Sequence, residues 1–558
     1  MAKPRIRLKA GAGRAMPSAS AQGGFISTGG LGGGAHHGAS QTLRDVAAWH
    51  AARGSGDGDL LPDLPELQYR ARDIRRNNGF AHSIVQTSVD NIVGTGLRLS
   101  AQPDYLALQR ISKTFDKTWA DEWSAQIESL YHEWWWSTAC HAGDTKTGDM
   151  LTEEVLFAKF DNGGSLTLPL WIPDRGDGFA TKLQTVEIDR LSNPNLQPNT
   201  PTLRGGVAFD DYGVPLGYHI RRAHPGDAFY MLNSANAMQW DYVPRRTPFG
   251  RLRVIHDFTG DRADQTRGKP LLSAVLDQFK NLDRYVKAEI QAALMNAMIW
   301  GAITTPLEHE EIVELFKGDE TAYMKARADH AVAMKAGTLA TLFPGDKLEP
   351  FMPSRPAAQF GVFAKNVSRI IAVGANMPYE LAMKDFSDSN YSNTRAAMLE
   401  FWRSVNRCRD RLGAGWFDPI YGLFMEEMVN ANRISAPRYY EFRRAYQRCI
   451  WIGPGRGYVD KTKEAQGDLI MLNGRTTTLQ KVCAEQGTHW REVLDQCATE
   501  ERYMQSLGIQ RIVATPSPTR VSDSNVDPAV DPETGDAALD DSNAPTQPGG
   551  DNPAEVPA

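Results

Sequence analysis

The chain has 558 residues, which is too long for one ordinary domain and predicts two to four domains. Its formal net charge of −6 argues against a protein that coats nucleic acid through a broad basic surface. Residues 512–558 hold nine acidic side chains and one arginine, so the rest of the chain has a net charge of +2 and any contact with DNA has to be local.

The cysteines indicate neither a disulfide framework nor a metal site. There are five, at Cys140, Cys408, Cys449, Cys483 and Cys497, and none lies in a CxxC or Cys/His pair with metal-ligand spacing. We therefore expect buried thiols in a reducing compartment. The start of the chain lacks the apolar region of a secretory signal, and the longest nearly apolar run is too short to cross a bilayer, which predicts no membrane partner.

Both ends have the composition of disordered segments. Residues 1–41 are rich in Gly, Ala and Ser without apolar periodicity, and residues 512–558 are rich in Pro, Asp, Ser and Ala. We expect a disordered arm and a disordered acidic tail, with no internal repeat between them.

The first part of the folded region reads as helices. Residues 42–98 predict two helical pieces, of which the longer covers 67–93 and ends at Gly94 and Gly96. Residues 105–142 continue as helix with a wide aromatic face, and 151–161 form a short helix capped by Thr152.

Residues 163–258 change to short alternating or apolar runs separated by Gly, Pro, Asn and Asp, which predicts an antiparallel sheet with a hairpin turn at Gly213. Helix returns over 269–301, with Pro270 in the first turn and a strip of basic residues at three-four spacing on one face. A short helix over 308–335 and extended pieces around 337–351 follow.

Residues 357–412 contain two helical patterns on either side of a polar connector. Pro378 removes a backbone donor, and the polar run 387–393 competes with helical hydrogen bonds. The second helix is predicted to start at Asn393 or Thr394. Helices over 414–432 and 435–447, a Gly/Pro loop at 453–457 and further helices to about 508 complete the folded part.

Five segments in order carry a resemblance to a known family. They cover 71–104, 183–194, 205–227, 254–285 and 342–403, and include a VGTG turn, a PGD motif and the sequence Pro378-Tyr379-Glu380. Together they resemble the lambda-family phage portal protein over nearly the whole ordered chain.

The resemblance implies an α+β, mainly helical portal fold that forms rings. It assigns the regions as follows: wing 42–265, first stem helix 266–300, clip 301–356, second stem helix 357–379, channel loop and long helix 380–412, and crown 413–511.

The same resemblance implies a ring of twelve copies at one capsid vertex of a tailed phage or prophage, assembled in the host cytoplasm. Double-stranded DNA would be packaged and ejected through the ring. The implied protein partners are the terminase large subunit, the major capsid or scaffold proteins, and the head-completion or neck proteins. No cofactor, metal or catalytic residue is implied.

Basic side chains on the stem helices and polar groups in the connector are the candidate DNA contacts, because contacts to phosphate carry no sequence information and suit a channel that passes any DNA. For each residue alone, a solvated helix face or an ordinary surface loop is the alternative. The candidates are Lys280, Arg284, Lys287, Lys365 and Arg369 on the stem helices, Lys384, Asp385, Asp388, Ser389, Asn390 and Asn393 in the channel loop, and Arg395 and Arg403 on the channel helix.

Enzyme motifs are mostly absent from the sequence. The glycine-rich segment 23–34 lacks the GK[ST] of a phosphate-binding loop, and there is neither an HExxH nor a GxSxG sequence. A metal-dependent nuclease using the acidic loop 257–264 is the alternative function, and a capsid or neck scaffold without a channel is a third. Rings with a central hole would favour the portal, whereas magnesium-dependent cleavage of plasmid by a monomer would favour the nuclease.

Overall fold

The computed structural model describes most of the chain between residues 54 and 509, in two compact units, 1–492 and 493–558. The predicted disordered arm 1–41 and acidic tail 512–558, and most of the predicted clip, lie outside the described residues. The described residues are 54–227, 238–298, 301–304, 347–350, 360–387, 390–457 and 461–509, with a few isolated positions between 44 and 325.

The first long helix predicted from the sequence is two helices. After the short α1 (Gly56–Leu60), α2 covers Leu64–Asn77 and α3 covers Gly79–Ile92. Asn78 separates them, because its backbone is extended and its side-chain oxygen accepts hydrogen bonds from the amides of Phe80 and Ala81. The prediction of one helix over 67–93 was therefore wrong, since an asparagine cap restarts the helix within an unbroken apolar pattern.

The helix predicted over 105–142 is also interrupted, giving α4 (Tyr105–Leu108) and α5 (Lys117–Trp135). The next helix, α6, covers Gly148–Asn162 and is capped by Thr147, whose hydroxyl accepts from the amide of Met150. Thr152 was predicted to be this cap. It is instead buried inside the helix and donates to the Gly148 carbonyl.

The predicted antiparallel strands are confirmed, but they form two sheets. One has the order β3-β2-β8 and the other β4-β5-β6-β7. The hairpin between β5 and β6 turns at Gly213, whose φ of 78° is the left-handed conformation that glycine adopts without strain. The strands are β2 (Gly164–Trp171), β3 (Thr181–Val186), β4 (Leu203–Arg204), β5 (Val207–Phe209), β6 (Pro215–Arg221), β7 (Trp240–Pro244) and β8 (Ile255–Phe258).

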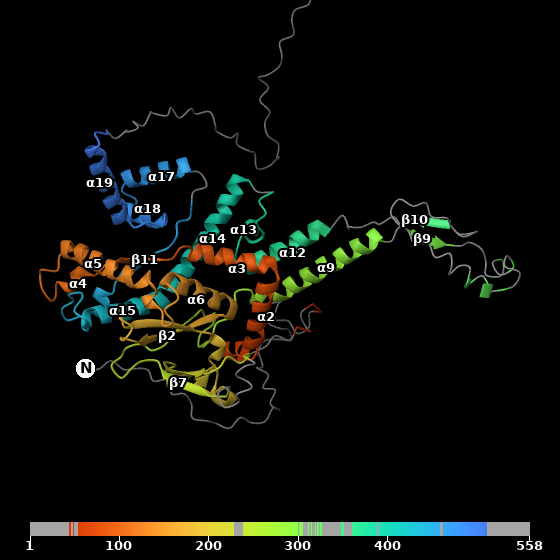
Figure 1. Ribbon diagram of the computed structural model, residues 1–558, viewed down its shortest axis with the longest axis horizontal. Coiled ribbons are helices and arrows are strands. Elements are labelled where there is room, and N and C mark those ends of the chain that lie inside the picture. Colours follow the sequence, from red (N-terminus) through yellow and green to blue (C-terminus); the bar gives the residue numbers. More distant parts are fainter. Residues whose placement is uncertain are drawn as a thin grey trace, which may run out of the picture. The chain divides into compact units, whose positions relative to one another are not determined.

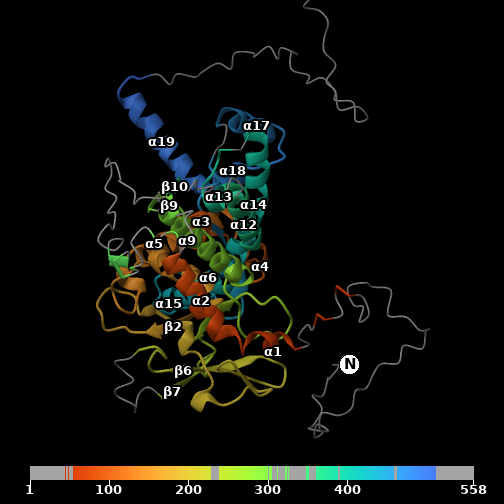
Figure 2. The same ribbon diagram turned by 90° about the vertical axis from the view of Figure 1, so that its right-hand side faces the viewer.

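Two helices that are distant in sequence lie side by side (Figure 1 and Figure 2). They are α9 (Leu276–Met298) and α12 (Phe360–Gly374). The ring of Tyr285 on α9 packs against those of Phe360 and Phe363 on α12, with centroids 5.6 and 4.8 Å apart. Helix α9 begins after Pro270, which precedes a short 3-10 turn rather than lying in the first helical turn as predicted. Between α9 and α12, β9 (Gly301–Thr304) pairs with β10 (Lys347–Pro350).

The connector after α12 contains a short helix, α13 (Tyr379–Met383), which packs against α3. The long helix α14 (Tyr391–Leu412) follows and runs through a π-helical turn, Gly413–Phe417, into α15 (Asp418–Asn430). Its cap is Asn390, three residues before the predicted start. The helix predicted over 435–447 shortens to α16 (Arg443–Tyr446), and α17 (Lys461–Asn473), α18 (Leu479–Glu485) and α19 (Trp490–Ser506) complete the described chain.

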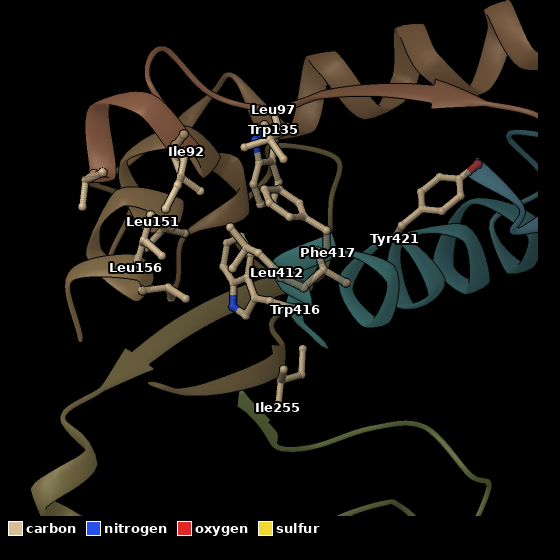
Figure 3. Close-up of a cluster of buried hydrophobic side chains, with 14 of the residues drawn as sticks. Ile92, Leu97, Trp135, Leu151, Leu156, Ile255, Leu412, Trp416, Phe417 and Tyr421 are labelled. Atoms are coloured by element: carbon tan, nitrogen blue, oxygen red, sulfur yellow. The ribbon is translucent and has the colours of Figure 1, made fainter. Parts of the chain in front are cut away.

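An aromatic core joins the early and late parts of unit 1 (Figure 3). Trp135 of α5 packs against Trp416 and Phe417 of the π-helical turn, and Tyr131 packs against Tyr421 of α15. Strand β1 (Arg98–Ala101) pairs antiparallel with β11 (Cys449–Ile452). The larger hydrophobic cluster of unit 1 is therefore closed by segments that lie far apart in the sequence.

All five cysteines are free thiols, but the prediction that they are buried holds only in part. Cys140 and Cys483 are buried, Cys408 and Cys449 are half-buried, and Cys497 is exposed.

Candidate functional site

The predicted basic strip on α9 is exposed but not uniformly positive. Lys280 approaches Asp73 of α2 at 3.8 Å, and Lys287 donates to Asp283 of its own helix at 2.8 Å. Arg284 lies between them and is exposed. Since nearby carboxylates offset two of the three cations, the strip is a weaker attractor of phosphate than its sequence suggests.

The two basic residues predicted on α12 converge on an aromatic ring. Lys365 Nζ lies 5.8 Å from the centroid of the Tyr379 ring, and Arg369 Cζ lies 5.6 Å from it. Both distances are within the range of cation–π attraction. Tyr379 was noted in the sequence only as part of a family motif, and no spacing rule pairs it with residues ten to fourteen positions earlier.

The first half of the predicted channel loop is attached to the same tyrosine. The Tyr379 hydroxyl donates to Asp385 Oδ2 at 3.1 Å, and the hydroxyl and amide of Ser387 both donate to Asp385 Oδ1. These hydrogen bonds, that of the Ser387 hydroxyl foremost, lower the pKa of Asp385. Burial, and then the bond to Asp385, raise the pKa of Tyr379. Asp385 therefore stays a carboxylate and Tyr379 stays a neutral donor near pH 7.

The second half of that loop begins α14. Asn390 caps the helix, accepting at 2.9 Å from the amide of Asn393, which itself lies in the first helical turn. Asp388 and Ser389, also predicted for the loop, lie outside the described residues. Lys384 ends α13 in the left-handed conformation, with a φ of 54°. The connection between α13 and α14 is thus shorter than the predicted loop, because Asn390 caps α14 and Asn393 lies in its first turn.

The predicted basic residues of α14 are on its surface. Arg395 is exposed, and Arg403 is exposed and pairs with Glu400 one turn earlier at 2.6 Å. An exposed pair of this kind contributes little to stability, so Arg403 can leave it for another anion at small cost.

Helix α12 packs against α9 and still carries exposed apolar side chains. Val362, Ile370 and Val373 are 64, 55 and 78% exposed. Val373 also borders a hollow of about 570 Å³, formed with Met377, Phe401 and other residues of the α12–α14 region. Apolar surface left exposed on a helix that is already packed on one side indicates a docking face.

Arg409, missed in the sequence, fastens α14 to two other segments. Its Nε donates to the Ile92 carbonyl at 2.9 Å, and its Nη2 donates to the carbonyls of Asn91 and Pro454, each at 2.7 Å. Burial lowers the pKa of Arg409 to about 10, so it is charged at neutral pH. A cation on the last carbonyls of α3 also complements the helix dipole.

The acidic loop of the alternative function does not form a metal site. Asp257 is buried in β8 and pairs with Lys159 at 2.8 Å, and Asp261 pairs with Lys269 at 2.7 Å. Asp264 adopts a φ of 62° in a turn, and its carbonyl accepts from Arg204. Within the described ranges, no three His, Cys, Asp or Glu side chains gather around a common point that could hold a metal ion. The nuclease interpretation has no support in this geometry.

Of the helices in the described parts of the chain, none combines the length and the apolar character that crossing a membrane requires.

Comparison with known proteins gives consistent results. The family model described as "Phage portal protein, lambda family" matches residues 42–409. The chain is 26% identical over 497 residues to "Portal protein B" of Escherichia phage lambda, covering 86% of this chain and 91% of that protein. It is 28% identical over 499 residues to "Portal protein" of Escherichia phage N15, covering 85% and 91%.

A solved structure, "Neck of empty GTA particle computed with C6 symmetry", contains a chain with a TM-score of 0.44 and 14% identity, covering 76% of this chain and 93% of that chain.

Proposed function

The chain belongs to the lambda family of phage portal proteins, and from this premise we propose that twelve copies close into a ring that conducts double-stranded DNA. The family match over residues 42–409 carries the proposal, because it includes α9, α12, α13 and most of α14. The ring would occupy one capsid vertex of a tailed phage, where DNA enters during packaging and leaves during ejection.

The exposed apolar face of α12 supports association of copies. Val362, Ile370 and Val373 recur at nearly helical spacing and so lie along one side of the helix. Burying an aliphatic side chain of this size is worth about 1.5–3 kcal/mol. In a ring, the same three side chains would be buried at every subunit boundary. The summed free energy of association would therefore be large even if each side chain were only half buried.

The charged side chains support passage of DNA without tight binding. Lys280, Arg284 and Lys287 would repeat around the ring, as would Arg395 and Arg403 on α14. Each is exposed or loosely paired, and such cations attract phosphate without reading sequence. Few cations per subunit would let a duplex slide.

We assign the regions of the chain by family resemblance. The wing covers 42–265, the stem helices 266–300 and 357–379, the clip 301–356, the channel loop and helix 380–412, and the crown 413–511. The clip would dock the terminase large subunit and later the head-completion or neck proteins, and the capsid or scaffold proteins would surround the wing. Portal proteins are structural components, so the ATPase of the motor would belong to the terminase.

The shape and mass of the purified protein test the proposal. Negative-stain images should show rings with a central hole, and light scattering should give about twelve times the chain mass. Val373→Asp should lower the mass, because it places a charge on the apolar face of α12. Tyr212→Asp alters a comparably exposed side chain in the β5–β6 turn and should leave the ring intact. A wild-type chain that stays monomeric at high concentration would refute the ring.

A further inference from the structure

Tyr379 connects α12 to the loop that follows α13. Its ring lies within 6 Å of both Lys365 and Arg369, which come from successive turns of α12. Its hydroxyl donates to Asp385, beyond the end of α13. One side chain therefore contacts the basic pair and the start of the loop at once.

Asp385 is oriented by contacts to both of its oxygens. Oδ2 accepts from Tyr379, and Oδ1 accepts from the hydroxyl and the amide of Ser387. The preceding residue, Lys384, has a φ of 54°, which costs a non-glycine residue about 1 kcal/mol or more. A strained backbone of this kind persists only where neighbouring contacts hold it. The hydrogen bonds to Asp385, the next residue after Lys384, are the contacts beside this strained position.

We propose that Tyr379 is a positioning residue that latches loop residues 384–387 to α12, and that DNA phosphate competes with its ring for Lys365 and Arg369. The second part rests on the proposed DNA-conducting function, whereas the first does not. A cation–π contact at an exposed site is worth about 0.5–1 kcal/mol, whereas a hydrogen bond between a cation and an anionic oxygen is stronger. A passing phosphate would therefore draw the two cations away from the Tyr379 ring. The ring would then be held less firmly against α12, and the loop that its hydroxyl holds through Asp385 would loosen.

Hydrogen exchange of the backbone amides of the loop tests the latch without DNA. Tyr379→Phe removes the hydroxyl but keeps the ring, so the amides of Phe386 and Ser387 should exchange at least about threefold faster. Tyr440→Phe is the matched control, because its hydroxyl donates to Asn430 at 3.0 Å in another part of the fold. That variant should leave the loop unchanged.

A double-mutant cycle separates a direct contact from a general loss of structure. Asp385→Ala should also accelerate exchange, and adding Tyr379→Phe to it should have no further effect, since the partner is already gone. Additive effects of the two substitutions, or unchanged exchange in Tyr379→Phe, would overturn the latch.

A short duplex of mixed sequence tests the competition. At low salt the duplex should accelerate loop exchange in the wild type at least about twofold, and high salt should abolish the effect. Tyr379→Leu removes both ring and hydroxyl, so its loop should exchange fast with or without duplex. If the duplex leaves wild-type exchange unchanged while Tyr379→Phe accelerates it, the latch stands and the competition is refuted. Failure of the ring itself would show separately, as a monomer in light scattering.

Discussion

Replacing Arg409 by methionine should loosen the junction between α14, α3 and the segment after β11. The guanidinium donates to three backbone carbonyls, those of Asn91, Ile92 and Pro454, and it stacks over the Trp402 ring at 5.0 Å. Hydrogen bonds from a charged donor contribute about 1.5–3 kcal/mol each. The regained hydration of a half-buried cation offsets part of that sum, so we expect a local loss of about 3 kcal/mol.

Native-state hydrogen exchange measures this loss where it occurs. The amides of Val93 and Gly94, which both donate to the Val89 carbonyl at the end of α3, report opening of that junction. Because 1.4 kcal/mol is a factor of ten, a loss of 3 kcal/mol corresponds to exchange about a hundredfold faster. Global unfolding is a poorer measure of this local loss, because long chains of more than one unit generally do not unfold in a single two-state step.

Arg411→Met is the matched control, since Arg411 lies two residues further along α14 and is exposed. It should change exchange at Val93 by less than about threefold, as surface substitutions do. Equal effects in the two variants, or no effect in Arg409→Met, would refute the assignment of Arg409 as the fastener of α3.

Three further outcomes are expected. Burial raises the pKa of Glu128 from 4.5 to about 7, so the folded protein binds this proton more tightly than the unfolded chain and loses stability as pH rises through that window. Glu128→Gln should therefore show a smaller fall in melting temperature between pH 5 and pH 8. Removal of residues 512–558 should leave ring mass unchanged by light scattering, because that composition cannot bury a core. Lys365→Glu with Arg369→Glu should lower packaged DNA, measured per particle, while rings still form.

Much of the architecture could be predicted from local pattern, because antiparallel strands and amphipathic helices carry their periodicity in neighbouring residues. The break at Asn78 shows where this reasoning fails. The apolar pattern of α2 and α3 is continuous, and only the capping ability of one side chain redirects the backbone. Such a cap can be predicted from the sequence only if the Asn78-Gly79 pair is given more weight than the continuous apolar pattern around it.

The candidate site was harder to predict, since its contacts depend on where the chain returns. Asn376 has a φ of 56° and its amide donates to the Val373 carbonyl, which reverses the chain after α12. That reversal brings Tyr379 back over Lys365 and Arg369. Sequence spacing placed Lys365 and Arg369 on one helix face, but it could not predict that the aromatic ring of Tyr379 contacts both.

A basic residue in a sequence is evidence of a free cation only after its three-dimensional neighbours are known. Lys280 approaches an aspartate from another helix, Arg409 is committed to backbone carbonyls, and Lys365 contacts a tyrosine. Apolar exposure is a more direct indication of an interface in this chain. Val373 is 78% exposed, and keeping an aliphatic side chain in contact with water is unfavourable. In the proposed ring, the exposed aliphatic side chains of α12 are where a neighbouring copy would pack. The assembly is therefore better argued from the uncovered side of α12 than from the distribution of charge.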